Sequence, residues 1–215
     1  SSLEEAVRLN AEQPDWHHAL GALYLKEARY QSAVESFLAA VELAPGEPRH
    51  LAWAARAYAH LRRPETAAEY LEAALKLQPD QAAWYAELGQ LRRQTGKAEV
   101  ALAACQRAEE LDPDNSAYTL ETAQVLMGLK RWSEAEVKLR QLLGEEPKQA
   151  QAWAALGQAL EGQGRLTDAL AHLERAAELA PEAEGHRVGA ARVRRLLGQN
   201  DAALALLEQV LEANP

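Results

Sequence analysis

Apolar residues recur along this chain at intervals of three and four, the pattern of helices that bury one face. In residues 14–47, Leu20 and Tyr24 mark one such stripe, and Ala33 and Phe37 mark a second stripe after a turn. The same two stripes follow one another along the rest of the chain. This alternation predicts an all-α chain built from pairs of helices.

The helix pairs repeat every 34 residues without an insertion. Proline ends each second helix because it lacks an N–H, at Pro45, Pro79, Pro113, Pro147, Pro181 and Pro215. An alanine twelve residues earlier keeps the same spacing, at Ala33, Ala67, Ala101, Ala135, Ala169 and Ala203. Glycine, which tolerates positive φ at a helix end, occupies one turn position at Gly96, Gly164 and Gly198. Two independent registers that agree six times identify a true repeat.

These spacings define the expected organisation of the chain. Six repeats cover residues 14–215, divided as 14–47, 48–81, 82–115, 116–149, 150–183 and 184–215. Residues 1–13 read as the second helix of a truncated repeat, since Leu3, Ala6 and Leu9 keep the register of the later second helices. One helix pair cannot bury both of its apolar faces, so we expect the pairs to stack into one continuous solenoid.

The repeat resembles the tetratricopeptide repeat family over almost the whole chain. The family's Leu-Gly pair is present in alternate repeats, as Leu20-Gly21, Leu88-Gly89 and Leu156-Gly157. Its tryptophan, or a neighbour of it, is present in the same repeats, as Trp16, Trp84 and Trp153. The resemblance implies a right-handed superhelical solenoid of antiparallel helix pairs, with the first helices lining a concave groove. Arg92 and Arg194 depart from the family by replacing an aromatic residue, so we expect less close helix packing there.

Composition excludes some classes of function. The net charge of −9 disfavours nucleic acid as a partner, and no apolar run is long enough for direct membrane insertion. With one cysteine the chain has no internal disulfide, and the sequence does not choose between a cytoplasmic and a periplasmic location. The Ala-, Leu- and Arg-rich composition is typical of bacteria with high-GC coding. Lys and Arg are concentrated in the first helices and turns, and acidic residues in the remainder.

The ninth position of each repeat carries a run of long hydrogen-bond donors: Ala22 is followed by Arg56, Gln90, Gln124, Gln158 and Arg192. In the family this position faces the groove, where such a ladder would bond the backbone or the carboxylates of an extended segment. The predicted partner-binding residues are Arg49, Trp53, Arg56, Gln90, Arg93, Gln124, Gln158, Arg192 and Arg195. Two alternatives stay open: the ladder is an ordinary solvated face, and Trp53 packs on the adjoining helix rather than anchoring a partner.

Signals for catalysis or for known peptide-binding schemes are missing. The family's two-carboxylate clamp and its asparagine ladder both lack their residues at the matching first-helix positions. Cys105 stands at a repeat position otherwise held by Phe or Leu and reads as a packing residue. His17 and His18 read as surface histidines, without a ligand set at zinc spacing. We therefore expect no enzyme activity, no cofactor and no metal.

The main hypothesis is a non-catalytic scaffold that binds an extended or helical, acidic protein segment in its concave groove. The alternative is a structural spacer or assembly platform within a longer repeat protein of a bacterial envelope, pilus or polysaccharide-export machine, acting through its ends. That alternative includes self-association through the C-terminal repeat, whose apolar residues lack a cover. A third hypothesis is a non-catalytic domain attached to an enzyme.

Overall fold

The computed structural model describes residues 2–213, and within them it contains thirteen α-helices and no strand. The predicted all-α class is confirmed. The helices are α1 Ser2–Leu9, α2 Pro14–Lys26, α3 Tyr30–Leu43, α4 Pro48–His60, α5 Pro64–Leu77, α6 Ala82–Gln94, α7 Ala98–Leu111, α8 Ser116–Gly128, α9 Trp132–Glu145, α10 Ala150–Gly162, α11 Leu166–Leu179, α12 Glu184–Leu196 and α13 Asn200–Ala213.

The helices follow the 34-residue period of the sequence. Each complete pair consists of a first helix of 13 residues and a second helix of 14 residues. The turn between them contains one residue of positive φ in all six pairs, with φ between 59° and 79°. Gly96, Gly164 and Gly198 hold this place in three pairs, and Ala28, Arg62 and Lys130 hold it in the others. The turn geometry is therefore common to all repeats, and glycine is its least strained occupant.

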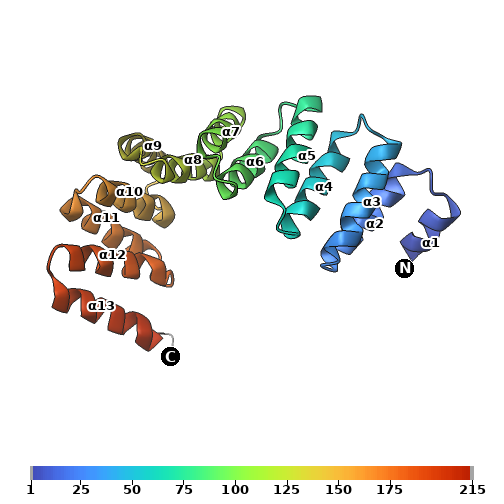
Figure 1. Ribbon diagram of the computed structural model, residues 1–215. Helices are drawn as coiled ribbons and strands as arrows, with labels where there is room; N and C mark the ends of the chain where they lie inside the picture. The colour runs from blue at the N-terminus through green and yellow to red at the C-terminus, as the bar shows by residue number, and fades with distance from the viewer. Residues whose placement is uncertain (1, 214–215) are drawn as a thin grey trace. The chain divides into compact units, whose positions relative to one another are not determined.

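The chain forms two compact units, Ser1–Pro113 and Asp114–Pro215. The N-terminal unit contains α1–α7 and the C-terminal unit contains α8–α13. Within each unit every helix packs against its neighbours in the chain, as Figure 1 shows for the stacked ribbons. Each unit is thus a stack of helix pairs, the arrangement of a helical solenoid.

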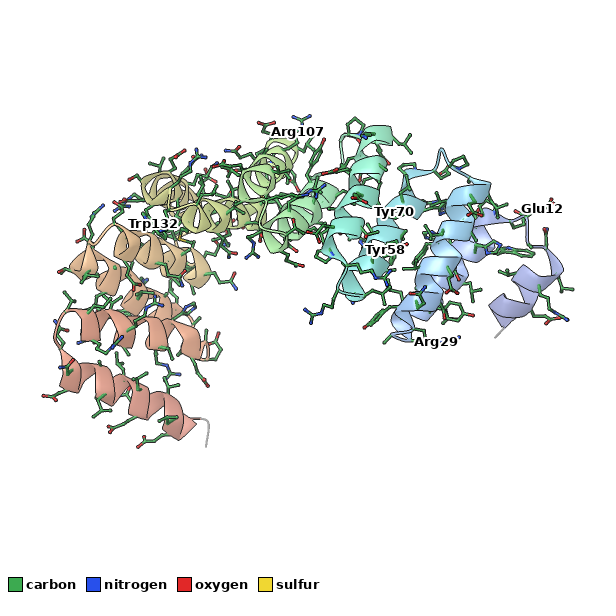
Figure 2. The ribbon with its side chains drawn as sticks, in the orientation of Figure 1. Glu12, Arg29, Tyr58, Tyr70, Arg107 and Trp132 are labelled. Atoms are coloured by element: carbon green, nitrogen blue, oxygen red, sulfur yellow. The ribbon has the colours of Figure 1, made fainter. Side chains whose placement is uncertain are left out.

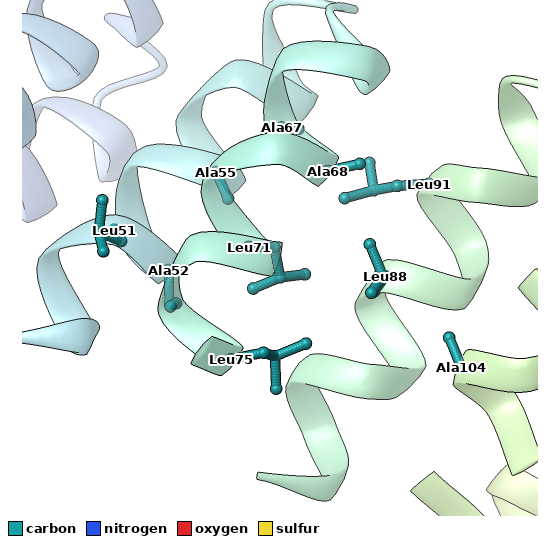
Figure 3. Packing of buried hydrophobic residues seen from close by; sticks show 11 residues of the cluster. Leu51, Ala52, Ala55, Ala67, Ala68, Leu71, Leu75, Leu88, Leu91 and Ala104 are labelled. Carbon is teal, nitrogen blue, oxygen red and sulfur yellow. The ribbon is translucent and has the colours of Figure 1, made fainter. Parts of the chain in front are cut away.

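Small residues let the helices of a stack approach closely. In the core of the N-terminal unit, Leu71 and Leu75 of α5 face Leu88 and Leu91 of α6 (Figure 3). The periodic alanines lie at the tightest contacts, which is why they recur: five of the six are fully buried, at Ala33, Ala67, Ala101, Ala135 and Ala169. Their burial explains the conserved spacing within this chain as a packing requirement.

The glycine of the Leu-Gly pair has a packing role as well. A Cβ atom on Gly21 would lie 2.8 Å from the Phe37 ring, and one on Gly157 would lie 2.7 Å from Leu173 Cγ. Both distances are too short for van der Waals contact, so only glycine lets the second helix place a large side chain there.

Arg92 corrects the expectation of looser packing at the replaced aromatic position. Its side chain is only 8% exposed, and its Nε donates a hydrogen bond of 3.0 Å to Glu72 Oε1 of the preceding repeat. Arg194 pairs with Glu174 of the preceding repeat through its Nη2. At both places an ion pair fills the space that tyrosine occupies in the first repeats.

The N-terminal helix α1 agrees with the sequence prediction as far as the structure describes it. Residues 2–9 are helical as predicted, and α1 packs on α2, but the side chains of Leu3 and Ala6 lie outside the described residues. Pro215 lies outside them too. None of the helices in residues 2–213 combines the length and apolar character needed to cross a membrane.

Candidate functional site

The ninth-position side chains lie at the surface of the first helices. Gln90, Gln124, Gln158 and Arg192 are exposed, and Arg56 is half-buried. Five of the nine predicted partner-binding residues line two cavities, one in each unit. We call these cavities pocket A, in the N-terminal unit, and pocket B, in the C-terminal unit.

Pocket A has a volume of about 210 Å³ and lies between α4 and α6. Its apolar lining comes from Ala55, Ala59 and Leu91. Its polar lining comes from Arg56, His60, Glu87, Gln90 and Gln94. The lining of pocket A would therefore accept a ligand with a small apolar side chain flanked by polar groups.

Arg56 is fixed within the rim of pocket A. Its Nε donates to both carboxylate oxygens of Glu87 at 3.1 Å, and its Nη2 donates to one of them at 2.5 Å. Its guanidinium also lies 4.9 Å from the centre of the Trp53 ring, close enough for a cation–π contact. The arginine is therefore held in one orientation, with its charge balanced by Glu87.

Pocket B is larger, with a volume of about 640 Å³. It brings together the ninth residues of three successive repeats, Gln124, Gln158 and Arg192. Met127 of α8 and Trp132 of α9 supply its large apolar side chains, and Figure 2 labels Trp132. Its size suits a bulkier side chain than pocket A accepts.

The Trp132 ring fits its site only because the residue opposite it in the next repeat is a glycine. A Cβ atom on Gly162 would lie 2.5 Å from the Trp132 ring. At the equivalent place in the N-terminal unit, Tyr30 stacks on His60 with ring centroids 4.8 Å apart. In both units an aromatic residue at the start of a second helix therefore covers the end of the following first helix.

Arg192 is less constrained than Arg56. Its Nη2 donates to Glu161 Oε2 at 2.7 Å, and its side chain is 50% exposed. One carboxylate oxygen thus orients the guanidinium while other N–H groups face solvent. The excess of basic residues on the first helices is partly offset inside the pockets, because Glu87 and Glu161 both lie there.

The remaining predicted residues lie outside the two pockets. Arg49 pairs with Asp15 across 2.5 Å at the start of its helix, and Arg93 and Arg195 are exposed. Trp53 is half-buried and packs against His18 and Phe37, with ring centroids 5.9 Å away in each case. Packing on the adjoining helix, one of the two readings left open, is therefore what Trp53 does.

Sequence reasoning missed Met127, Trp132 and the two glutamates of the pockets. The register of the first helices does not contain Trp132, because this residue begins a second helix. Its signal was an aromatic residue 30 positions before a glycine, the same spacing as Tyr30 and His60.

A buried histidine pair corrects the expectation that His18 is a surface residue. His18 of α2 is half-buried and His50 of α4 is fully buried, with their Nδ1 atoms 3.0 Å apart. Burial, together with the charges of His50 and Arg49, lowers the pKa of His18 to about 4. Burial and the charge of Arg49 also lower the pKa of His50. One neutral ring donates to the other, so protonation of both rings breaks this contact.

Acidification should destabilise the N-terminal unit through this pair. The unfolded chain takes up protons on histidine near pH 6.5, whereas folded His18 does so only near pH 4. The stability is therefore complete above pH 6.5 and is lost as the pH falls towards 4. Urea midpoints at about pH 7 and about pH 5 should differ less in His18→Gln than in the wild type. The control His17→Gln should keep the full difference; an unchanged pH dependence in His18→Gln would rule out the pair as its source.

The structure also places the single cysteine and the residue types that bind metals. Within them no group of three or more His, Cys, Asp or Glu side chains is placed to hold a metal ion. Cys105 is buried beneath Gly89 in the N-terminal unit, as its repeat position predicted. The surface features that stand out are the two pockets.

Comparisons with known proteins agree with this architecture. A tetratricopeptide repeat model matches residues 1–48, 54–116 and 120–184, and a second model of the same description matches residues 160–215. No curated protein sequence matches the chain.

Several solved structures share the fold at low sequence identity. A tetratricopeptide repeat protein from Parabacteroides merdae has a TM-score of 0.84 at 16% identity, over 93% of this chain and 79% of that one. YrrB, described as having an unusual peptide-binding site, has a TM-score of 0.76 at 18% identity, over 91% and 98%. PilF of Pseudomonas aeruginosa has a TM-score of 0.71 at 18% identity, over 100% and 95%.

Proposed function

Since this chain belongs to the tetratricopeptide repeat family, we propose that it is a non-catalytic module whose first helices bind another protein, at pocket A in the N-terminal unit and at pocket B in the C-terminal unit. The fold is generally one of protein–protein interaction scaffolds. The proposal specifies the surface and the chemistry of the bound segment. It extends to this chain the kind of ligand in the description of YrrB, a peptide.

The proposal rests on three glutamine side-chain amides that have no hydrogen-bond partner among the described residues. Gln90, Gln124 and Gln158 are exposed in the pockets and hydrogen-bond to no other described residue. A glutamine side chain donates and accepts at once, so it pairs with both groups of a peptide bond. Gln90 at pocket A, and Gln124 and Gln158 one repeat apart at pocket B, each suit an extended or helical segment whose side chains enter that pocket.

The charges favour an acidic segment. Arg192 is exposed beside the amides of pocket B, and Arg195 is exposed on the same helix. Glu161 uses only part of the hydrogen-bonding capacity of Arg192. An acidic side chain of a partner would bond the remaining N–H groups. In the N-terminal unit Arg56 is already paired with Glu87, so its role is to orient the rim.

Charge reversal tests the proposal with a matched control. The double variant Arg56→Glu/Arg192→Glu changes first helices, whereas Arg107→Glu/Arg175→Glu makes the same change on second helices. Arg107 and Arg175 pair with Glu110 and Glu178 one turn away and are about half exposed. We expect the first variant to retain about tenfold less of the captured partner than the wild type, and the second to retain the wild-type amount.

Capture from native lysate, read out by quantitative mass spectrometry, measures both variants. Circular dichroism establishes that each variant keeps its helix content. Equal recovery by the wild type and by Arg56→Glu/Arg192→Glu would refute a role for the first-helix surface. Loss of the partner only in the second-helix variant would move the site to the opposite face.

A further inference from the structure

A further cavity adjoins pocket A in the N-terminal unit. It has a volume of about 480 Å³ and is lined by Tyr30, Ala59, His60, Arg62 and Gln94. These residues come from the start of the second helix α3, from the end of α4 and the turn after it, and from the end of α6. Ala59, His60 and Gln94 line pocket A as well, so the two cavities share a wall. We call this cavity pocket C.

Every polar side chain of pocket C can donate a hydrogen bond. Arg62 offers its guanidinium N–H groups and Gln94 its amide, while Tyr30 offers its hydroxyl. The His60 ring donates from one nitrogen and is held by stacking on Tyr30. None of these four side chains has a hydrogen bond or an ion pair with another described residue. Pocket C therefore presents a set of unused donors to a ligand.

The charge of pocket C differs from that of pockets A and B. Its lining contains Arg62 and no carboxylate, whereas Glu87 lines pocket A and Glu161 lines pocket B. The turns that follow α4 and α6 add Arg63 and Lys97, which are exposed and have no ion pair with another described residue. A cavity with unused donors and an unpaired cation favours an anion as its ligand.

The donor set of pocket C is not a general feature of the repeat. Three repeats further along the chain, the places of Tyr30, Ala59, His60, Arg62 and Gln94 are held by Trp132, Glu161, Gly162, Gly164 and Leu196. This second set has no cation and includes a carboxylate. The fold therefore does not require the residues of pocket C, and their chemistry belongs to one place in the N-terminal unit.

We propose that pocket C binds the carboxylate of an acidic residue in the partner, next to a small apolar residue whose side chain enters pocket A. This inference rests on the proposed function, because its occupant is the protein that the first helices hold. Arg62 supplies the charge, and Gln94 and Tyr30 donate to the carboxylate oxygens, which have about four lone-pair sites between them. Arg62 thus takes the role that the sequence assigned to Arg56, which Glu87 already pairs.

A capped valine–glutamate dipeptide, titrated against the whole chain, probes pockets A and C together. Binding is followed by NMR through the side-chain amides of Gln90 in pocket A and Gln94 in both pockets, and through the Nε–H of Arg62. We expect saturable shifts at all three. Exchanging the glutamate of the probe for glutamine should weaken binding about fivefold, and so should Arg62→Gln in the chain, since each removes one exposed ion pair. The two changes together should weaken it no further than either alone.

Arg63→Gln is the matched control. It removes the same charge from the next residue of the same turn, outside the lining of pocket C, and should leave binding unaltered. Circular dichroism establishes that both variants keep their helix content. Equal weakening by Arg62→Gln and Arg63→Gln would overturn the proposal in favour of nonspecific attraction between charges.

The Gln90 signal separates this inference from the proposed function. Shifts at Gln90 with binding that ignores Arg62→Gln would overturn the role of pocket C and leave pocket A as a binding site. An absence of saturable shifts at Arg62 and Gln94 would overturn that role as well. Binding of a valine–phosphoserine probe without binding of the glutamate probe would contradict the choice of a carboxylate, because pocket C would then select a phosphoryl group.

Discussion

Leu173→Ala will lower the free energy of unfolding of the C-terminal unit by about 3 kcal/mol, whereas Leu207→Ala will lower it by about 1 kcal/mol. Leu173 and Leu207 occupy the same repeat position, and the change to alanine removes the same atoms from each. Leu173 is 1% exposed, between Gly157 and Gly189, and its removal leaves a cavity. Leu207 is 38% exposed on α13, so its removal gives up less buried surface.

Native-state hydrogen exchange measures this contrast inside one unit. In Leu173→Ala the backbone amides of α10–α12 should exchange faster, by the factor that corresponds to the lower free energy of unfolding. In Leu207→Ala their exchange rates should change little. Equal losses for the two variants would show that Leu207 is covered in solution, by a bound helix or by a second copy.

Glu72→Leu will lower the free energy of unfolding of the N-terminal unit by about 3 kcal/mol. The substitution leaves the guanidinium of Arg92, 8% exposed, without its carboxylate partner. The double variant Glu72→Leu/Arg92→Tyr introduces the combination that Leu38 and Tyr58 form at the same two repeat positions, and it should fall within about 1 kcal/mol of the wild type, since apolar residues replace buried ion pairs at little cost.

A double-mutant cycle with Arg92→Tyr completes this test. If Glu72 and Arg92 act as a matched pair, each single variant is destabilised more than the double variant. Additive losses would show that the two side chains are independent.

The sequence predicts the helices well because their determinants are local. The turn that includes Gly96 or Ala28 and the periodic alanines depend on residues within one pair, so the 34-residue period transfers directly to the structure. The ladder also follows from the period alone, since Gln90 and Gln158 share one repeat position.

What the sequence did not predict depends on contacts between repeats. The repeat pattern does not explain Arg92, because its partner Glu72 lies 20 residues earlier in the preceding repeat. The repeat pattern predicts His18 at the surface, because its partner His50 lies 32 residues away in the next repeat. Trp132 joins pocket B through Gly162, whose missing side chain leaves the space for its ring. Such contacts depend on how neighbouring helices align with one another, and the pattern within one repeat does not contain that information.

Site-specific photo-crosslinking tests the central claim, that the first helices hold the partner. A photoreactive residue is placed at Gln90 or Gln158, both in the pockets, or at the exposed Gln106 on the second helix α7. Irradiation in lysate should join one protein to positions 90 or 158 and not to 106. Crosslinks only from 106, or from none of the three positions, would contradict the account.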